Sequence, residues 1–295
     1  MKALSGFYYV SGQTGTVQCR ARGKFKHEGQ TPLVGDMAEY TDLGGGQGIV
    51  DSLLPRKNSF SRPPVANLDM LVIVASRAIP VTDEFLVDKM TAIAAHNGVE
   101  PVVVVNKTDL VIGETMSAAY RKAGFRALAV SAVTGEGMDV LRELLAGRVC
   151  AFTGNSGVGK SSILNALEPG FNIETADVSY KLGRGRHTTR HVELFETSFG
   201  AVIADTPGFA SFDTESAELT RASDLQYAFP DFAPYIDSCA FTGCSHIRER
   251  GCAVLKALEE GKIVPFRHRS YVRLYEKLRE NKDWELKTKK GQTAR

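Results

Sequence analysis

Residues 148–168 read RVCAFTGNSGVGKSSILNALE, an apolar run followed by a glycine-rich turn and a helix-forming stretch. The turn fits the pattern G-x-x-x-x-G-K-[ST], in which backbone N–H groups converge on phosphate oxygens and the following helix N-terminus favours the anion. Lys160 is predicted to bridge the β- and γ-phosphates and to serve catalysis, and Ser161 to ligate Mg²⁺. The predicted phosphate-binding residues are Gly154, Asn155, Ser156, Gly157, Val158, Gly159, Lys160, Ser161 and Ser162.

Similar apolar runs recur on both sides of this stretch and alternate with helical stretches. Continuous runs of this kind are typical of a parallel sheet that helices cover on both faces. The chain therefore predicts a doubly wound α/β domain. Residues 191–196 (HVELFE) alternate instead, which predicts an edge strand. The continuous runs lie at 70–76, 101–109, 127–132, 148–154 and 201–208.

The run at 201–208 ends in Asp205-Thr206-Pro207-Gly208. An aspartate at a strand end can hold Mg²⁺ through water, and the Gly208 N–H can reach a γ-phosphate. A capped turn with no ligand would explain the same four residues, but the phosphate loop beside it favours the nucleotide interpretation.

Asn106-Lys107-Thr108-Asp109 follow a run of four valines. The Asp109 carboxylate can accept hydrogen bonds from guanine N1–H and the 2-amino group, and Lys107 can lie along the base plane. A backbone N–H at Ser131-Ala132 can meet guanine O6. Each such group left unpaired costs ~1–3 kcal/mol, so these motifs together predict binding of GTP and argue against an ATP-dependent kinase or ATPase.

Three cysteines and a histidine crowd into a short polar stretch at Cys239, Cys244, His246 and Cys252. Three thiolates and one imidazole form the ligand set of a closed structural zinc site, and four ligands leave no position open for catalysis. Buried free cysteines are the alternative. Thiol ligands indicate a reducing, intracellular compartment, and no window approaches the ~18 uncharged apolar residues of a membrane-spanning helix.

The net charge of +2 is unevenly distributed: residues 1–65 carry +3, residues 262–295 carry +7 and the residues between carry −8. Basic ends indicate a polyanionic partner or, alternatively, only solvated segments. Short β-prone runs over residues 1–60 predict a small barrel, and alternation places Arg20, Arg22, Lys24 and Lys26 on one side of it. Residues 54–64 predict a polar linker. Near the end, one helix face is apolar and is predicted to pack on the metal-binding segment; it contains Tyr271, Leu274, Tyr275 and Leu278.

The nucleotide motifs occur in a rotated order, with NKTD and SA before the phosphate loop and DTPG. This order, the barrel, the LGRGRHTTRH segment and the cysteine spacing together resemble the ribosome-small-subunit-dependent GTPase A family over essentially the whole chain. The resemblance implies an N-terminal OB-fold RNA-binding domain (1–64), a circularly permuted GTPase domain (65–212) and a zinc-binding domain with a C-terminal helix (213–295). It also implies GTP/GDP, Mg²⁺ and one structural Zn²⁺ as ligands, and a cytoplasmic monomer that binds the small (30S) ribosomal subunit and its rRNA, with ribosomal proteins as further contacts.

Hydrolysis needs a group that orients water, and Phe209 after DTPG cannot do so. His187, in the segment where the first switch belongs, is the candidate, and the resemblance points to the same residue; contact with phosphate or RNA is its alternative role. Thr188 or Thr189 is predicted to ligate Mg²⁺, with Thr189 favoured; ordinary residues at a strand edge are the alternative. We expect a GTPase that the small subunit stimulates late in subunit maturation and that hydrolysis releases; a nucleotide-gated rRNA-binding scaffold with incidental hydrolysis is the alternative.

Overall fold

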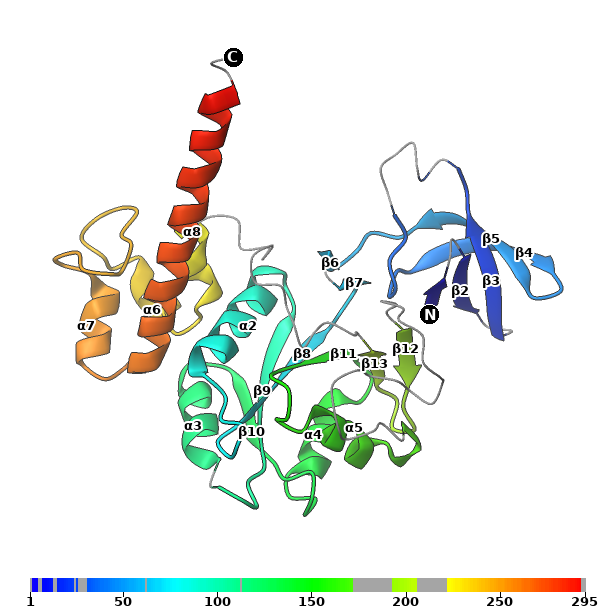
Figure 1. Cartoon of the computed structure of the whole chain (residues 1–295), viewed down its shortest axis with the longest axis horizontal. Helices are drawn as coiled ribbons and strands as arrows, with labels where there is room; N and C mark the ends of the chain where they lie inside the picture. Colours follow the sequence, from blue (N-terminus) through cyan, green and yellow to red (C-terminus); the bar gives the residue numbers. More distant parts are fainter. Residues whose placement is uncertain are drawn as a thin grey trace.

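The computed structural model shows a small β-barrel, a central α/β unit and a C-terminal helical unit, with the C-terminal helix extending away from the body (Figure 1). It describes residues 2–4, 7–12, 15–23, 25, 31–61, 63–111, 113–171, 193–205 and 222–292. Among these residues, none of the helices has the length and apolar character that crossing a membrane requires.

The five apolar runs form five parallel strands at the centre of the sheet, as predicted, and the structure gives their order as β10-β9-β8-β11-β13. Their alternate residues enter two cores because side chains of a strand point to opposite faces. Ile73 and Val103 pack with α2 and α3, whereas Val72 and Val104 pack with α4 and α5. The bounds are β8 Met70–Ser76, α2 Glu84–His96, β9 Glu100–Asn106, α3 Glu114–Lys122, β10 Arg126–Ala129, α4 Met138–Leu145, β11 Val149–Thr153, α5 Lys160–Leu167, η1 Pro169–Phe171 and β13 Val202–Asp205.

The alternating HVELFE run forms β12 (Glu193–Glu196), which pairs antiparallel with β13. The prediction that it lies at the sheet edge was wrong, because β1 pairs with its other side through Lys2 and Glu193. The barrel strands thereby continue the central sheet to eleven strands. Pairing between such distant strands leaves no local sequence pattern.

The N-terminal strands surround a small core of their own that includes Val10, Val17 and Phe25. The predicted polar linker instead folds into a β6–β7 hairpin, where Phe60 is 1% exposed and belongs to the main core. The Asn58 side chain fixes this turn by pairing with both backbone groups of Leu68, at 2.8 and 3.0 Å. The bounds are β1 Lys2–Leu4, β2 Phe7–Gly12, β3 Gly15–Ala21, β4 Ala38–Gly44, β5 Gln47–Leu53, β6 Ser59–Ser61 and β7 Pro64–Ala66.

The C-terminal unit shares the core that covers one face of the sheet, because Phe229 and Leu274 belong to the same cluster as Ile73 of β8. The apolar face predicted for the last helix is confirmed: Tyr271 and Leu274 are buried, and Tyr275 and Leu278 pack against the cluster. The bounds are η3 Ala222–Ala228, α6 Ala233–Ile236, α7 Ala253–Glu259 and α8 Pro265–Gln292.

Candidate functional site

The carboxyl ends of the parallel strands meet at one edge of the sheet, and Asn106 links three motif loops there. Its side-chain Nδ2 donates to the Val158 carbonyl of the phosphate loop at 3.0 Å, and its Oδ1 accepts from the Ala132 N–H at 3.2 Å. Because Asn106 is buried, these two bonds fix the loops against one another. Residues 106, 132 and 158, which the sequence assigned to separate motifs, therefore form one site.

The phosphate loop adopts a backbone that only glycine tolerates at its two ends. Gly154 has φ 136° and Gly159 φ 96°, and an added Cβ would overlap the Val74 carbonyl or the Asn106 side-chain nitrogen. Lys160, at the start of α5, is 6% exposed and donates to the carbonyls of Gly154 and Asn155, both at 2.7 Å. Burial lowers the pKa of Lys160 to about 8. Among its described contacts this buried cation has no anionic partner. Because a buried charge is costly unless it is paired, a phosphate group bound in the loop would stabilise it.

The base-recognition residues are connected as well. The Ser131 hydroxyl donates to Asp109 Oδ1 at 2.6 Å, which ties the carboxylate to the Ser131-Ala132 loop. Lys107 takes a left-handed backbone conformation, with φ 67°. Its ammonium donates to the Ile79 carbonyl at 2.9 Å.

That carbonyl belongs to a loop, residues 77–83, which was not predicted as part of the site. Ser76 N donates to the Thr82 hydroxyl at 2.9 Å, which closes the loop at the end of β8. Pro80 is placed so that a Cβ on Gly157 would approach it to 3.1 Å. The loop therefore contacts both the phosphate loop and Lys107, and it leads directly into α2. No motif marks it in the sequence.

Several predicted residues fall wholly or partly outside the described residues. Those that lie there entirely are Lys24, Lys26, His187, Thr188, Thr189 and Gly208. Asp205 is described only in its backbone, as the last residue of β13, whose neighbour β11 leads into the phosphate loop. The sheet thus brings the Asp205 backbone to the same edge as Lys160 and Ser161 at the start of α5.

The predicted metal ligands Cys239, Cys244, His246 and Cys252 converge, with ligand atoms all within 4.8 Å of one another. A tetrahedral zinc with Zn–S ≈ 2.3 Å and Zn–N ≈ 2.0 Å would set S···S near ~3.8 Å and S···N near ~3.5 Å. The structure has 3.9 Å between Cys239 and Cys252 Sγ, and 3.6 and 3.4 Å from His246 Nδ1 to those sulfurs. The residues present therefore fit zinc in number, type and spacing.

The surroundings of this cluster favour a bound cation. Burial raises the pKa of the Cys244 thiol to about 12 and raises that of Cys252, so a nearby positive charge is needed to hold both as thiolates. Burial lowers the pKa of His246, which keeps its imidazole neutral. Burial would raise the pKa of Glu249, but hydrogen bonds from Ser245 and neighbouring backbone N–H groups outweigh it and lower the pKa to about 2.

A buried arginine joins the C-terminal unit to the sheet. Arg267 of α8 is completely buried and forms ion pairs with Asp88 of α2 and Asp231, each at 2.9 Å. Its guanidinium lies 4.7 and 4.4 Å from the ring centroids of Phe125 and Phe229. The sequence contained a signal for it, because position 267 lies one turn before Tyr271 on the apolar face of the helix.

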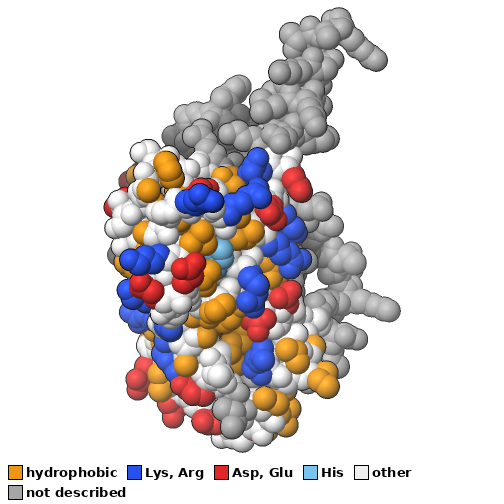
Figure 2. Space-filling model, turned by 90° about the vertical axis from the view of Figure 1, so that its left-hand side faces the viewer, with side chains coloured by type: hydrophobic (Ala, Val, Ile, Leu, Met, Phe, Trp, Pro, Cys, Tyr) orange, Lys and Arg blue, Asp and Glu red, His pale blue; other side chains and the backbone are white. Residues whose placement is uncertain are grey.

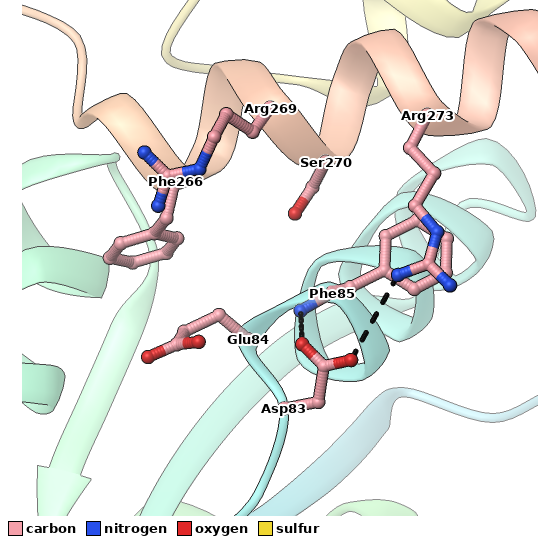
Figure 3. A pocket seen from close by; sticks show the side chains of 7 residues that line it. All are labelled: Asp83, Glu84, Phe85, Phe266, Arg269, Ser270 and Arg273. Carbon is pink, nitrogen blue, oxygen red and sulfur yellow. Dashed lines mark hydrogen bonds and ion pairs between the residues drawn. The ribbon is translucent and has the colours of Figure 1, made fainter.

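A cavity of about 160 Å³ lies where α8 crosses the start of α2 (Figure 3), and none of its lining residues belongs to the nucleotide motifs. Arg273 covers the Phe85 ring at 3.7 Å and approaches Asp83 to 3.9 Å. Figure 2 shows the left-hand side of the molecule as seen in Figure 1, with Lys and Arg side chains scattered among acidic and hydrophobic ones. Among the described residues on this face, the basic side chains are interspersed with acidic ones and form no continuous basic surface.

The rotated motif order, the doubly wound sheet and the joined nucleotide loops define a circularly permuted GTPase of the phosphate-loop class. The family model described as RsgA GTPase matches residues 53–215, and the RsgA N-terminal domain model matches residues 1–50. The chain therefore belongs to the RsgA GTPase family and hydrolyses GTP.

Individual relatives agree along nearly the whole chain. A Caldanaerobacter subterraneus protein named small ribosomal subunit biogenesis GTPase RsgA is 41% identical, covering 95% of each chain. The crystal structure of YjeQ from Thermotoga maritima is 33% identical, with a TM-score of 0.79 over 93% of this chain and 95% of that one. YloQ, titled a circularly permuted GTPase, is 32% identical, with a TM-score of 0.77 over 95% of this chain and 93% of that one.

Proposed function

We propose that this chain is a maturation factor of the small ribosomal subunit that binds the subunit in its GTP form, hydrolyses GTP when the subunit stimulates it, and then leaves. The observation that carries the GTP part is Asn106, which joins the guanine-recognition loop to the phosphate loop through Val158. The named relatives support the ribosomal part. The barrel and the basic C-terminal segment are the proposed contacts with rRNA, and the chain acts as a monomer in the cytoplasm.

In this proposal Asp109 accepts the N1–H and 2-amino hydrogens of guanine, and Lys107 covers the base plane. Guanine O6 shares the Ala132 N–H with Asn106 Oδ1, and Ser131 holds Asp109 in place. An adenine base would leave Asp109 facing an acceptor, which the ~1–3 kcal/mol cost of each unpaired group excludes. Selectivity for GTP over ATP is the expected result.

The phosphates lie in the loop of residues 154–162. The Lys160 ammonium exchanges its two carbonyl partners for β- and γ-phosphate oxygens. The Ser161 hydroxyl, Thr189 and Asp205 are the oxygen groups that would hold Mg²⁺, which neutralises charge developing on the phosphates when it is bound. The Gly208 N–H is the proposed γ-phosphate donor that senses the nucleotide state.

The reaction transfers the γ-phosphoryl group to water. An oxygen–phosphorus bond forms to the attacking water, the bond to the β,γ-bridging oxygen breaks, and GDP and phosphate leave. We assign the orientation of the water to His187, because Phe209 offers no polar group at the position after DTPG. The same Phe209 favours the second candidate function, a nucleotide-gated rRNA-binding scaffold in which hydrolysis is incidental.

The cysteine cluster is proposed to hold one structural zinc ion. Cys239, Cys244, His246 and Cys252 would ligate it, and its charge would stabilise the thiolates and join the loop before α7 to the end of α6. All four positions being protein ligands, the site serves folding and takes no part in hydrolysis.

Turnover with and without small subunits tests the proposal, together with co-sedimentation in a non-hydrolysable GTP analogue and in GDP at several salt concentrations. We expect strong stimulation, and retention with the analogue but not with GDP. His187→Ala should lose the stimulated rate by ~10²–10⁴-fold, whereas the matched variant His191→Ala keeps it. Equal turnover with and without subunits would favour the scaffold, and full stimulated turnover by His187→Ala would refute its catalytic role.

A further inference from the structure

Gln226, in η3, contacts the proposed zinc site without being one of its ligands. Its side-chain Oε1 lies 2.7 Å from His246 Nε2. Its Nε2 donates to the Ser223 carbonyl at 3.1 Å, which settles the direction of the amide: the oxygen faces the histidine and the nitrogen faces away from it.

This contact decides which nitrogen of His246 carries the hydrogen. Because Gln226 Oε1 only accepts, His246 Nε2 must donate, and the Nδ1 lone pair is left pointing toward the sulfurs of Cys239 and Cys252 at 3.6 and 3.4 Å. A neutral imidazole has one donor and one acceptor nitrogen, so the hydrogen bond at one nitrogen selects the metal-binding form of the other.

The residues around His246 hold it for this role. His268 Nε2 lies 2.7 Å from the His246 carbonyl oxygen. The His246 ring packs against Phe232 and Tyr271. The backbone at His246 has φ 57°, an uncommon conformation for a non-glycine residue. These contacts fix where the ring lies, and the Gln226 amide is the described partner of its second nitrogen.

The segment that carries Gln226 is itself anchored to the GTPase core. Leu225 and Ala228 of η3 are buried in the cluster that covers α2. A few residues on, Asp231 pairs with the buried Arg267. Gln226 is therefore presented to the metal cluster from a part of the chain that packs on the sheet and lies between the DTPG strand and the first cysteine.

We infer that Gln226 is a positioning residue of the metal centre: it accepts the Nε2 hydrogen of His246, holds Nδ1 toward the thiolates, and so links η3 to the metal. The inference rests on the proposed zinc site. It predicts that zinc affinity depends on Gln226 although this residue is not one of the four zinc ligands.

Zinc content and zinc affinity of the full-length chain test the inference, with affinity measured by competition against a chromogenic chelator. Gln226→Leu removes the acceptor at similar size, Gln226→Glu keeps an acceptor, and Tyr227→Leu is the control, since Tyr227 belongs to the same turn and is 71% exposed. We expect Gln226→Leu to bind zinc ~10–100-fold more weakly, and Gln226→Glu and Tyr227→Leu to stay within a few-fold of wild type. GDP binding, measured in parallel, should be equal in all four proteins.

Each other result overturns the inference. Wild-type protein that contains no zinc as purified and takes up none when zinc is added would overturn both the proposed zinc site and the role of Gln226. One zinc per wild-type chain with an equally tight Gln226→Leu variant would overturn the role of Gln226 alone. Failure of Gln226→Glu to restore affinity, or equal weakening by Tyr227→Leu, would show that η3 matters through packing and would also refute it.

Discussion

Replacing Arg267 with methionine tests how the C-terminal unit is held on the sheet. The substitution keeps much of the apolar stem but removes the cation that faces Asp88 and Asp231 at 2.9 Å each. Both carboxylates have nearly or completely buried side chains, so neither can gain water in compensation. Burial raises the pKa of Asp88, and Arg267 opposes that shift; without Arg267 one buried carboxyl must take up a proton or remain as an uncompensated charge.

Breaking a buried ion pair from one side costs ~3–5 kcal/mol. The guanidinium also lies against the Phe125 and Phe229 rings, whose cation–π attraction is worth ~1–2 kcal/mol when desolvated and is only partly replaced by methionine. We expect a loss of about 4 kcal/mol, which at ~2–4 °C per kcal/mol lowers Tm by roughly 10 °C. Hydrogen exchange should rise mainly in α8 and η3, since these elements lose their attachment to α2.

Scanning calorimetry and hydrogen exchange measure the effect, and two further variants serve as controls. Arg269→Met changes an exposed arginine on the same helix and should leave Tm within about 1 °C. The triple variant Arg267→Met/Asp88→Asn/Asp231→Asn removes all three charges and should recover most of the loss, because no buried charge is left unpaired. A single variant as stable as wild type, or a triple variant less stable than the single one, would refute the reasoning.

Three further predictions concern the ligands. Asp109→Asn should weaken GTP binding by ~10²–10⁴-fold and favour a xanthine nucleotide, because an amide donates where guanine also donates; competition binding measures both, and unchanged GTP affinity would contradict the assignment. Zinc chelation should increase hydrogen exchange over residues 239–260 while GDP affinity stays constant, and a parallel loss of GDP affinity would contradict the structural role of the metal. Burial holds the pKa of Lys160 near 8, whereas bound phosphate raises it, so GDP binding should take up about half a proton at pH 8 and about 0.1 at pH 7, and affinity should fall as pH rises above 8. Calorimetry in buffers of different ionisation enthalpy measures the uptake, and equal values at both pH values would rule out Lys160 as its source.

The sequence was most informative where function or burial requires a fixed local pattern. The middle of β9 is an unbroken run of four valines, because helices cover both faces of the sheet and every side chain there is buried. The run therefore predicted a parallel strand. Gly154 and Gly159 are glycines because the loop backbone excludes any side chain there. The Cys239–Cys252 segment could be identified since four ligand-type residues rarely occur together by chance in so short a polar stretch.

Residues whose role depends on distant partners could not be identified in the same way. Gln226 is an ordinary polar residue until η3 places it beside His246. Asn58 lies in a stretch with the composition of a linker, yet its side-chain amide forms hydrogen bonds with both backbone groups of Leu68 and so holds the β6–β7 hairpin in place. Arg267 could have been suspected from its place on an apolar helix face, but its partner Asp88 is 179 residues away in sequence.

The rotated motif order does not alter the site, because strands pair in space whatever their order along the chain, provided that each keeps its direction. β8 pairs in parallel with both β9 and β11, and Asn106 reaches Val158 across 52 residues of sequence. The rotation instead changes the connection that leaves β13. The chain after β13 does not return to the central sheet within the described residues; η3 packs on α2 and presents Gln226 to the metal cluster. α2 itself begins at the loop that contacts Lys107 and Gly157. The nucleotide edge and the C-terminal unit are thus joined twice at the same buried arginine: Asp88 of α2 pairs with Arg267, and so does Asp231, which lies on the chain that follows β13.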